Sequence, residues 1–485
     1  MPDASPNERS LMTRERIGLI AGPVIFALML SANPPSGMTL PAWHTSACGI
    51  FMAIWWISEA LPIAATALLP LVLFPLLGVL KIDAAAAPYA NPIIFLFLGG
   101  FILAAGLEES GLHRRIALSI IRVVGTRSAN LVGGFMIATA LLSMWVSNTA
   151  TVMMMLPITL SVIRLTNERS AEPDRNLATS LLLGIAYAAS IGGLGTLIGT
   201  PPNALLAGFV KESYHVEIGF GQWMLVGVPL VAISLPLCWL LLAKILYPAR
   251  NREIEGGAEI IAREIRSLGA FGRSEAIVAI VGSLTALAWM FRPLLARFVH
   301  GLSDTGIAIA GGLALFVIPT RWRSGERVIS WKDVERLPWG VLILFGGGLS
   351  LAHAVESTGL AEWIGGRMSG LEGLPVVVIT LVVTTVIVFL TELTSNTATA
   401  AAFLPLVGSL AIGLGMNPLF LAVPAALGAS CAFMMPVATP PNALVYASGD
   451  VTIPQMAKAG LWLNLIFIVL INAILFTIAR PVLNL

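Results

Sequence analysis

Apolar runs long enough to cross a lipid bilayer recur along the chain from Ile17 to the C-terminus. The pattern predicts about eleven membrane-spanning helices, each of about twenty apolar residues, together with shorter re-entrant segments. We therefore expect an all-α integral membrane protein. The first run follows Arg9, Arg14 and Arg16. It could imitate a secretory signal peptide, but it is long for one and more spans follow, so we interpret it as an uncleaved first helix.

Two kinds of polar, helix-breaking motif interrupt the apolar runs, and each kind occurs once in each half of the chain. The sequence Ser-Asn-Thr-Ala-Thr occupies residues 147–151 and again 395–399, and Thr-Pro-Pro-Asn-Ala-Leu occupies residues 200–205 and again 439–444. Broken polar backbone at membrane depth is tolerated only where protein buries it or where it lines a cavity. A matched pair in two halves is typical of a transporter built from internal repeats, with the binding site at their interface.

Basic residues predict the orientation of the chain, because they concentrate in cytoplasmic loops. Arginine clusters mark the segments that we place in the cytoplasm, at residues 9–16, 114–127, 164–175, 250–273 and 321–336. This pattern places the N-terminus in the cytoplasm and the C-terminus outside.

The uncharged window between Arg127 and Arg164 has both ends on the predicted cytoplasmic side. As one helix it would be about 54 Å long, whereas the bilayer core is about 30 Å thick. We therefore expect a hairpin with residues 147–149 near its tip; two full spans joined by an outside turn are the alternative. If the two halves have inverted topology, the second hairpin enters from outside.

The repeats suggest a division of the chain into scaffold and transport parts. We expect the first helix and the scaffold part of the first repeat at residues 1–125, and its transport part, with the inner hairpin, at 126–245. A cytoplasmic linker helix is expected at residues 246–275. The scaffold part of the second repeat then falls at 276–370, and its transport part, with the outer hairpin, at 371–485.

Composition agrees with a membrane protein and argues against a soluble, disulfide-bonded, metal-binding or nucleic-acid-binding protein. Hydrophobic residues make up 57% of the chain and charged residues 11%, whereas soluble domains carry about 25% charged residues. The three cysteines are far apart and have neither metal-ligand spacing nor a disulfide framework. The net charge of +2 and the absence of a basic block give no indication of a nucleic-acid partner.

The Ser-Asn-Thr motifs offer neutral oxygen ligands, which hard cations prefer. Ser143 lies one helical turn before the first motif and Thr391 occupies the same place before the second. The paired prolines break the helix, which frees carbonyl groups near Gly199 and Ala438 to face a cation, while the next half-helix begins with N–H groups able to receive an anion. Hydrogen bonding within the helix bundle and simple kinks are the alternatives, and the duplication argues against both.

All four motifs lie in segments without lysine or arginine, at residues 128–163, 176–210 and 368–457. An anion bound there must be balanced by co-bound cations and by helix N-termini, unless a basic residue reaches in from elsewhere. Glu392 is the only acid between Glu362 and Asp450. It has two possible roles: raising cation affinity at the second site, or holding the hairpin through hydrogen bonds. Its counterpart in the first repeat is Met144, which argues against a ligand essential to both sites. Glu59, beside Trp55-Trp56, is expected to pair structurally with backbone or a neighbouring helix.

In these residues the chain resembles the divalent anion/sodium symporters, which carry dicarboxylates, citrate or sulfate. The likeness covers nearly the whole chain and includes both motif pairs, Trp55-Trp56 with Glu59, and the stretch from Pro338 to Gly348. It implies a homodimer in which a transport domain moves the site across the membrane against a fixed scaffold, as an elevator.

The resemblance also implies the site residues. A first sodium site would comprise Ser143, Ser147, Asn148 and Gly199. A second would comprise Thr391, Thr394, Asn396 and Ala438, with Thr394 and Ala438 acting through their backbone. The substrate carboxylates would meet Asn148, Thr149, Asn396 and Thr397, and the pocket would be closed by Thr200, Thr439 and Pro440.

The sequence thus predicts a secondary active transporter of the inner (cytoplasmic) membrane that imports C4 dicarboxylates such as succinate, malate and fumarate with sodium, using at least two sodium sites. A citrate or sulfate symporter and a sodium-independent exchanger are the alternatives within the family. An intramembrane enzyme would need a catalytic constellation, but the five histidines are scattered. A channel would more naturally repeat one pore motif in a ring.

Overall fold

The computed structural model describes residues 6–125, 127–169, 174–248, 256–321, 325–367 and 373–485. The described segments are helical and contain no β-strand, and an isolated bridge pairs Pro319 with Arg327. Four of the arginines that predict the orientation are not described here: Arg250, Arg252 and Arg323 lie outside the described residues, and Arg9 lies outside the described side chains.

The first half of the chain forms α1 to α12 and two short irregular helices. Their bounds are α1 Pro6–Ser31, α2 Leu40–Ser58, α3 Ile63–Thr66, α4 Leu69–Leu76, α5 Ile82–Ala86, η1 Ala87–Ala90, α6 Pro92–Glu109, α7 Leu112–Val124, α8 Ser128–Ser143, α9 Asn148–Arg169, α10 Arg175–Gly193, α11 Pro201–Tyr214, α12 Phe220–Leu240 and η2 Leu241–Leu246.

The second half follows a linker helix and contains the remaining elements. Their bounds are α13 Gly257–Ser267, α14 Arg273–Met290, α15 Arg292–Leu295, α16 Asp304–Val317, α17 Trp331–Glu335, α18 Trp339–Ser357, α19 Leu360–Arg367, α20 Val376–Thr391, α21 Asn396–Gly413, α22 Leu419–Ala429, α23 Pro440–Ala447, α24 Ile453–Ile474, η4 Leu475–Ala479 and α25 Arg480–Leu483. The linker predicted at residues 246–275 thus contains α13.

Eight helical segments of the described chain are long and apolar enough to cross a membrane by length and composition. Several further apolar helices are shorter, between 10 and 17 residues, and they include α8, α20 and α22. Helices α8 and α20 are short because each ends about one turn before a Ser-Asn-Thr motif, and α22 ends before the loop that leads to the second Pro-Pro pair. The polar motifs therefore divide what would otherwise be longer apolar spans.

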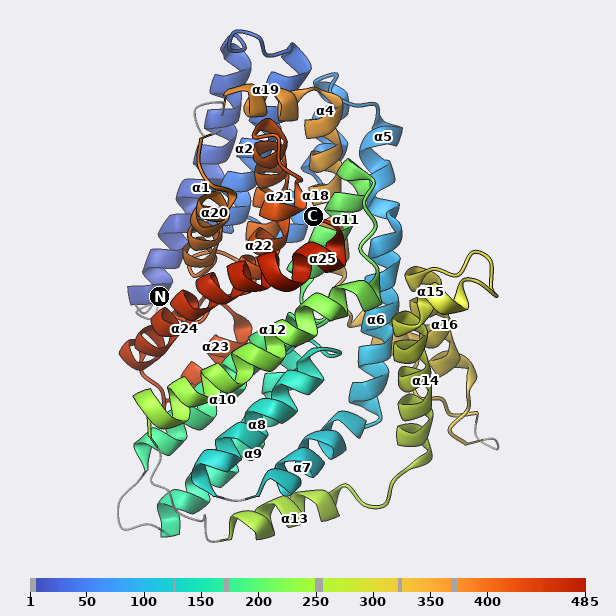
Figure 1. Cartoon of the computed structure of the whole chain (residues 1–485), viewed down its shortest axis with the longest axis vertical. Helices are drawn as coiled ribbons and strands as arrows, with labels where there is room; N and C mark the ends of the chain where they lie inside the picture. Colours follow the sequence, from blue (N-terminus) through green and yellow to red (C-terminus); the bar gives the residue numbers. More distant parts are fainter. Residues whose placement is uncertain (1–5, 126, 170–173, 249–255, 322–324, 368–372) are drawn as a thin grey trace.

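The two halves repeat one succession of elements. A helical hairpin (α8–α9, then α20–α21) is followed by a discontinuous helix (α10–α11, then α22–α23) and by a long helix that ends in a π-helical turn (α12–η2, then α24–η4). In Figure 1, α12 and α24 cross the middle of the molecule, with α8–α10 on one side of them and α20–α22 on the other. The sequence repeat is thus a structural repeat.

The discontinuous helices break in the same way. The residue before each Pro-Pro pair is extended, with φ −146° and ψ 141° at Thr200 and φ −144° and ψ 149° at Thr439. Proline suits the first turn of a helix because its fixed φ is helical and its missing N–H needs no partner there. The Pro-Pro pair therefore ends one half-helix and starts the next.

Contacts between the halves bring the motifs together. Helix α11 packs against α21 and α22 of the second half, and α23 packs against α9 and α10 of the first. Each half-helix that follows a Pro-Pro break therefore lies against the hairpin of the other half. All four motifs, distant in sequence, meet at this crossing.

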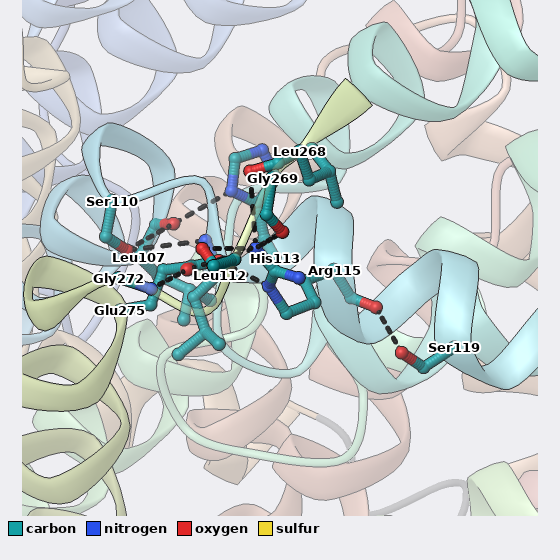
Figure 2. Close-up of polar contacts among 11 residues, drawn as sticks. Leu107, Ser110, Leu112, His113, Arg115, Ser119, Leu268, Gly269, Gly272 and Glu275 are labelled. Carbon is teal, nitrogen blue, oxygen red and sulfur yellow. Dashed lines mark hydrogen bonds and ion pairs between the residues drawn. The ribbon is translucent and has the colours of Figure 1, made fainter. Parts of the chain in front are cut away.

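A polar junction joins α7 to the start of α14, as Figure 2 shows. The Arg115 guanidinium donates to both carboxylate oxygens of Glu275, at 2.6 and 3.2 Å. It also donates to backbone carbonyls that follow the linker helix, those of Leu268, Gly269 and Ala270. Nearby, the Arg114 side chain lies 3.4 Å from Glu264 of α13. The linker helix is thus anchored to α7.

Candidate functional site

A cavity of about 800 Å³ lies where the four motifs meet. Ten of the thirteen residues proposed from the sequence line it: Ser147, Asn148, Thr149, Gly199, Thr200, Asn396, Thr397, Ala438, Thr439 and Pro440. The other three, Ser143, Thr391 and Thr394, are buried and are not among the residues that line the cavity. The structure therefore gathers the predicted residues into one site with two layers. The outer layer lines the cavity, and the inner layer consists of the three buried residues.

The inner layer of the first half holds Asn148 in place. The Ser143 hydroxyl oxygen lies 2.5 Å from Asn148 Oδ1 and 2.8 Å from the carbonyl oxygen of Ala189. A Cβ atom built on Gly193 would lie 2.9 Å from Asn148 Oδ1 and 3.0 Å from the Gly199 carbonyl oxygen. Oxygens of the hairpin tip and of the broken helix thus converge beside Gly193, in a cradle that a methyl group would fill. A cation prefers such an oxygen cluster.

The inner layer of the second half repeats this arrangement. The Thr391 hydroxyl oxygen lies 2.8 Å from Asn396 Oδ1 and 2.8 Å from the carbonyl oxygen of Ala429. Thr394 contributes differently, since its hydroxyl pairs with that of Thr399 at 2.5 Å and donates to the Leu390 carbonyl. Its side-chain hydroxyl is therefore occupied by these two contacts.

The asparagine of each Pro-Pro motif holds the loop before it, a role that our sequence reasoning missed. Asn203 Nδ2 donates to the carbonyls of Gly193 and Thr196, at 3.1 and 2.8 Å. Asn442 Nδ2 donates to those of Ala432 and Met435, at 3.2 and 3.1 Å. Each of these residues lies 239 positions before its counterpart in the second half, the donor and the two acceptors alike. This constant spacing, together with an asparagine that follows two prolines, was the available sequence signal.

Glu392 holds the loop before the second Pro-Pro motif. Its Oε1 accepts from the backbone N–H of Phe433 and Met434 and from Asn464 Nδ2, and its Oε2 accepts from the N–H of Met434 and Met435. Both carboxylate oxygens therefore have protein donors, and the geometry favours the second of the two roles left open. In the first half, Thr196 Oγ1 instead donates to the Met144 carbonyl at 2.5 Å.

The outer wall of the cavity comes from other helices, through Glu59, Phe101, Pro338 and Val341. The expectation that Glu59 pairs structurally is wrong. Within the described part of the chain, its carboxylate has no hydrogen-bond or ion-pair partner, and the side chain is exposed on the cavity wall. The reason is local: Glu59 adopts the left-handed conformation that ends α2, and its side chain leaves the helix there.

Four helices begin at the cavity. The first residues of α9, α11, α21 and α23 are Asn148, Pro201, Asn396 and Pro440, and all four line it. A helix N-terminus carries a partial positive charge, which attracts anions. At α11 and α23 the two leading prolines have no N–H to offer, so the dipole alone contributes there. Neither lysine nor arginine is among the described lining residues. Fixed dipoles are thus the source of positive potential that the protein itself supplies at this site.

Helices broken at facing polar motifs around a shared cavity define the chain as a polytopic membrane transporter. Solved structures agree at the level of the fold. The YdaH transporter of Alcanivorax borkumensis matches with a TM-score of 0.57 at 16% identity, covering 79% of this chain and 85% of the other. MtrF of Neisseria gonorrhoeae, described as one of a class of antimetabolite efflux pumps, matches with a TM-score of 0.56 at 13% identity, covering 96% and 98%.

The family follows from sequence comparison. Residues 13–484 match the model of the sodium:sulfate symporter transmembrane region, and the chain belongs to this family, the divalent anion/sodium symporters. Sodium-dependent dicarboxylate transporters named SdcS are among its relatives. That of Staphylococcus saprophyticus is 43% identical over 98% of this chain and 93% of its own length, and that of Staphylococcus aureus strain MRSA252 is 42% identical over 99% and 94%. The resemblance expected from the motifs is confirmed.

Proposed function

We propose that this protein is a secondary active transporter that imports C4 dicarboxylates, such as succinate, malate and fumarate, together with sodium across the bacterial cytoplasmic membrane. The observation that carries the proposal is that four helix N-termini and both copies of the Ser-Asn-Thr motif converge on one cavity. Among the described residues, neither lysine nor arginine lines this cavity. The name of the staphylococcal relatives supports both the dicarboxylate and the sodium dependence.

Two sodium ions travel with the substrate in this proposal. The first binds to Ser143, Ser147, Asn148 and the backbone of Gly199, and the second to Thr391, Asn396 and the backbone of Thr394 and Ala438. Two converging sets of oxygens support these sites: Asn148 Oδ1 with the Gly199 carbonyl beside Gly193 in the first half, and Asn396 Oδ1 with the Thr391 hydroxyl in the second.

The substrate binds between the two sodium sites. One carboxylate meets Asn148 and Thr149 and the other meets Asn396 and Thr397, while Thr200, Thr439 and Pro440 close the pocket. Sodium binds first in this proposal, orders the hairpin tips and creates the field that admits the dianion. Once bound, the cations and the helix N-termini together balance the two negative charges.

The transport cycle in this proposal is an elevator movement in a homodimer. The transport parts, residues 126–245 and 371–485, carry the site past scaffold parts at residues 1–125 and 276–370, in two repeats of inverted topology with about eleven spans. The N-terminus is cytoplasmic and the C-terminus is outside. The opposite placement of α8–α10 and α20–α22 about α12 and α24 supports the inverted arrangement (Figure 1).

Uptake of labelled succinate into proteoliposomes tests the substrate and the coupling. We expect uptake against the succinate gradient when sodium is supplied outside, and none when choline replaces sodium. Unlabelled malate and fumarate should compete strongly, and citrate, sulfate and 2-oxoglutarate weakly. Equal uptake with and without sodium would indicate the exchanger, and dominant competition by citrate or sulfate would replace the C4 dicarboxylate as substrate.

A further inference from the structure

Glu59 is the one charged residue among the described residues that line the cavity. It lies at the C-terminal end of α2, in the outer wall of the cavity that the Ser-Asn-Thr motifs also line. The other residues of that wall, Phe101, Pro338 and Val341, are apolar. A negative charge in a cavity that receives dianions is unexpected, since like charges repel.

The backbone at Glu59 adopts a conformation that is unfavourable for a residue with a side chain. Glu59 has φ 55° and ψ 33°, in the left-handed region, and its N–H donates to the Trp55 carbonyl to end the helix. Glycine is the residue most often found in this position, because it carries no Cβ. Eleven glycines of the described chain have positive φ, but only three other residues do. A glutamate in such a position is strained, and strain of this kind concentrates at functional sites.

Packing does not account for the side chain. Its carboxylate has no hydrogen-bond or ion-pair partner in the described part of the chain, and the residue is exposed. Glu392 is the contrasting case, because it is 3% exposed and both of its oxygens accept hydrogen bonds. The two acids of the site region therefore differ: Glu392 is fully bonded, whereas Glu59 lines the cavity without a side-chain partner among the described residues.

We propose that Glu59 is a specificity-determining residue that enforces the order of binding: its charge disfavours a dicarboxylate in the sodium-free cavity and attracts sodium ions into it. The proposal rests on the proposed sodium-coupled function and deepens it. Once sodium ions occupy the tips of the two hairpins, they outweigh the single charge of Glu59 and the dianion binds. Because Glu59 is on the wall and not in the motifs, it influences binding through the cavity and does not ligate the ions held there.

The test compares Glu59→Gln with Glu59→Asp in proteoliposomes at low ionic strength. We expect Glu59→Gln to raise the half-saturating sodium concentration about threefold and to lower the succinate KM at limiting sodium about threefold, the size of a charge–charge interaction across a water-filled cavity. Glu59→Asp keeps the charge and should behave as wild type. Added choline chloride should diminish the effect of Glu59→Gln, because salt screens the interaction.

The matched control is Asp83→Asn, which removes an exposed negative charge at α5, away from the cavity. It should leave both constants unchanged. Unaltered sodium and succinate constants in Glu59→Gln at low ionic strength would overturn the proposal. Equal losses of maximal rate in Glu59→Gln and Glu59→Asp, insensitive to added salt, would do so too, since they would indicate a structural role.

A second readout separates this proposal from the proposed function. Sodium stabilises a protein that binds it in the folded state, so the thermal shift between sodium chloride and choline chloride reports sodium binding without any substrate. Glu59→Gln should reduce this shift at low ionic strength. If wild type shows the thermal shift but no succinate uptake, the substrate assignment fails. The thermal shift of Glu59→Gln then still tests the Glu59 proposal. A shift in Glu59→Gln equal to that of wild type contradicts the proposal directly.

Discussion

Asparagine is used in two different ways at this site. Asn148 and Asn396 begin half-helices and face the cavity. Asn203 and Asn442 are fully buried, and their amide N–H groups hold the loops that carry the cavity carbonyls. A buried polar side chain that holds backbone in place is costly to remove, because the groups it leaves behind remain unpaired. The site is thus built from residues that bind and residues that position.

Glu392→Gln tests the positioning role of the buried acid. The amide puts N–H groups where the carboxylate accepts from Phe433, Met434 and Met435, and leaves at least one backbone N–H without an acceptor. We expect a loss of about 2–4 kcal/mol in the free energy of unfolding and a raised sodium requirement. Thermal unfolding in detergent and sodium titrations of uptake measure the two effects. The control is Glu335→Gln on the exposed face of α17, and a Glu392 variant as stable as this control would contradict the role.

The two acids show how far residue-level sequence reasoning reaches. For Glu392 the sequence left two roles open, since its donors at Phe433 to Met435 and at Asn464 are more than 40 residues away. For Glu59 the sequence-based expectation was wrong, because only the tertiary arrangement shows which helices form the cavity wall. The motif residues themselves could be predicted, since their chemistry is unusual within an apolar run.

At the scale of elements, the breaks in the helices create the site. Positions of the breaks could be predicted, because paired prolines end a helix and a long uncharged window between two arginine clusters must fold back. Their close fit could not be predicted. It depends on contacts such as that between Gly193 and the hairpin tip, where no sequence pattern marks this glycine among the 46 of the chain.

Gly193→Ala tests whether the cradle beside Asn148 holds a cation. The added Cβ would lie 2.9 Å from Asn148 Oδ1 and 3.0 Å from the Gly199 carbonyl oxygen, so it occupies the space in which these oxygens converge. We expect the half-saturating sodium concentration to rise by about tenfold or more, as expected when one ligand set is lost. Gly282→Ala is the control, because its Cβ would meet no heavy atom within 4 Å. Equal sodium dependence in the two variants would contradict the site.

At the scale of the whole molecule, the site has one wall from the motif helices and another from α2, α6 and α18. In the proposed elevator, the wall with the motifs would move while the other wall stays. The general architecture, an all-helical membrane transporter, could be predicted from hydropathy and the repeats. The polar junction at Arg115 could not, because its partners at Leu268 to Ala270 and Glu275 lie across the linker.

Arg115→Ala tests the junction of Figure 2. The side chains of Arg115 and Glu275 are 18% and 9% exposed, so removal of the guanidinium leaves a nearly buried carboxylate without its main partner. We expect a loss of about 2–3 kcal/mol in the free energy of unfolding. Arg114→Ala is the control, because the Arg114 and Glu264 side chains are 43% and 32% exposed and such pairs contribute about 0–1 kcal/mol. Thermal unfolding compares them, and equal destabilisation would contradict the assignment.

The measurement that tests the central claim most directly is sodium-driven succinate uptake by Asn148→Ala and Asn396→Ala. Each substitution removes a cavity-facing amide at the start of a half-helix, where sodium and substrate are proposed to meet. We expect each variant alone to lose sodium-dependent uptake, while the control Asn176→Ala, whose amide donates to the Pro248 carbonyl away from the cavity, keeps it. Uptake at the wild-type rate in both variants would contradict the claim that the two motifs form one site.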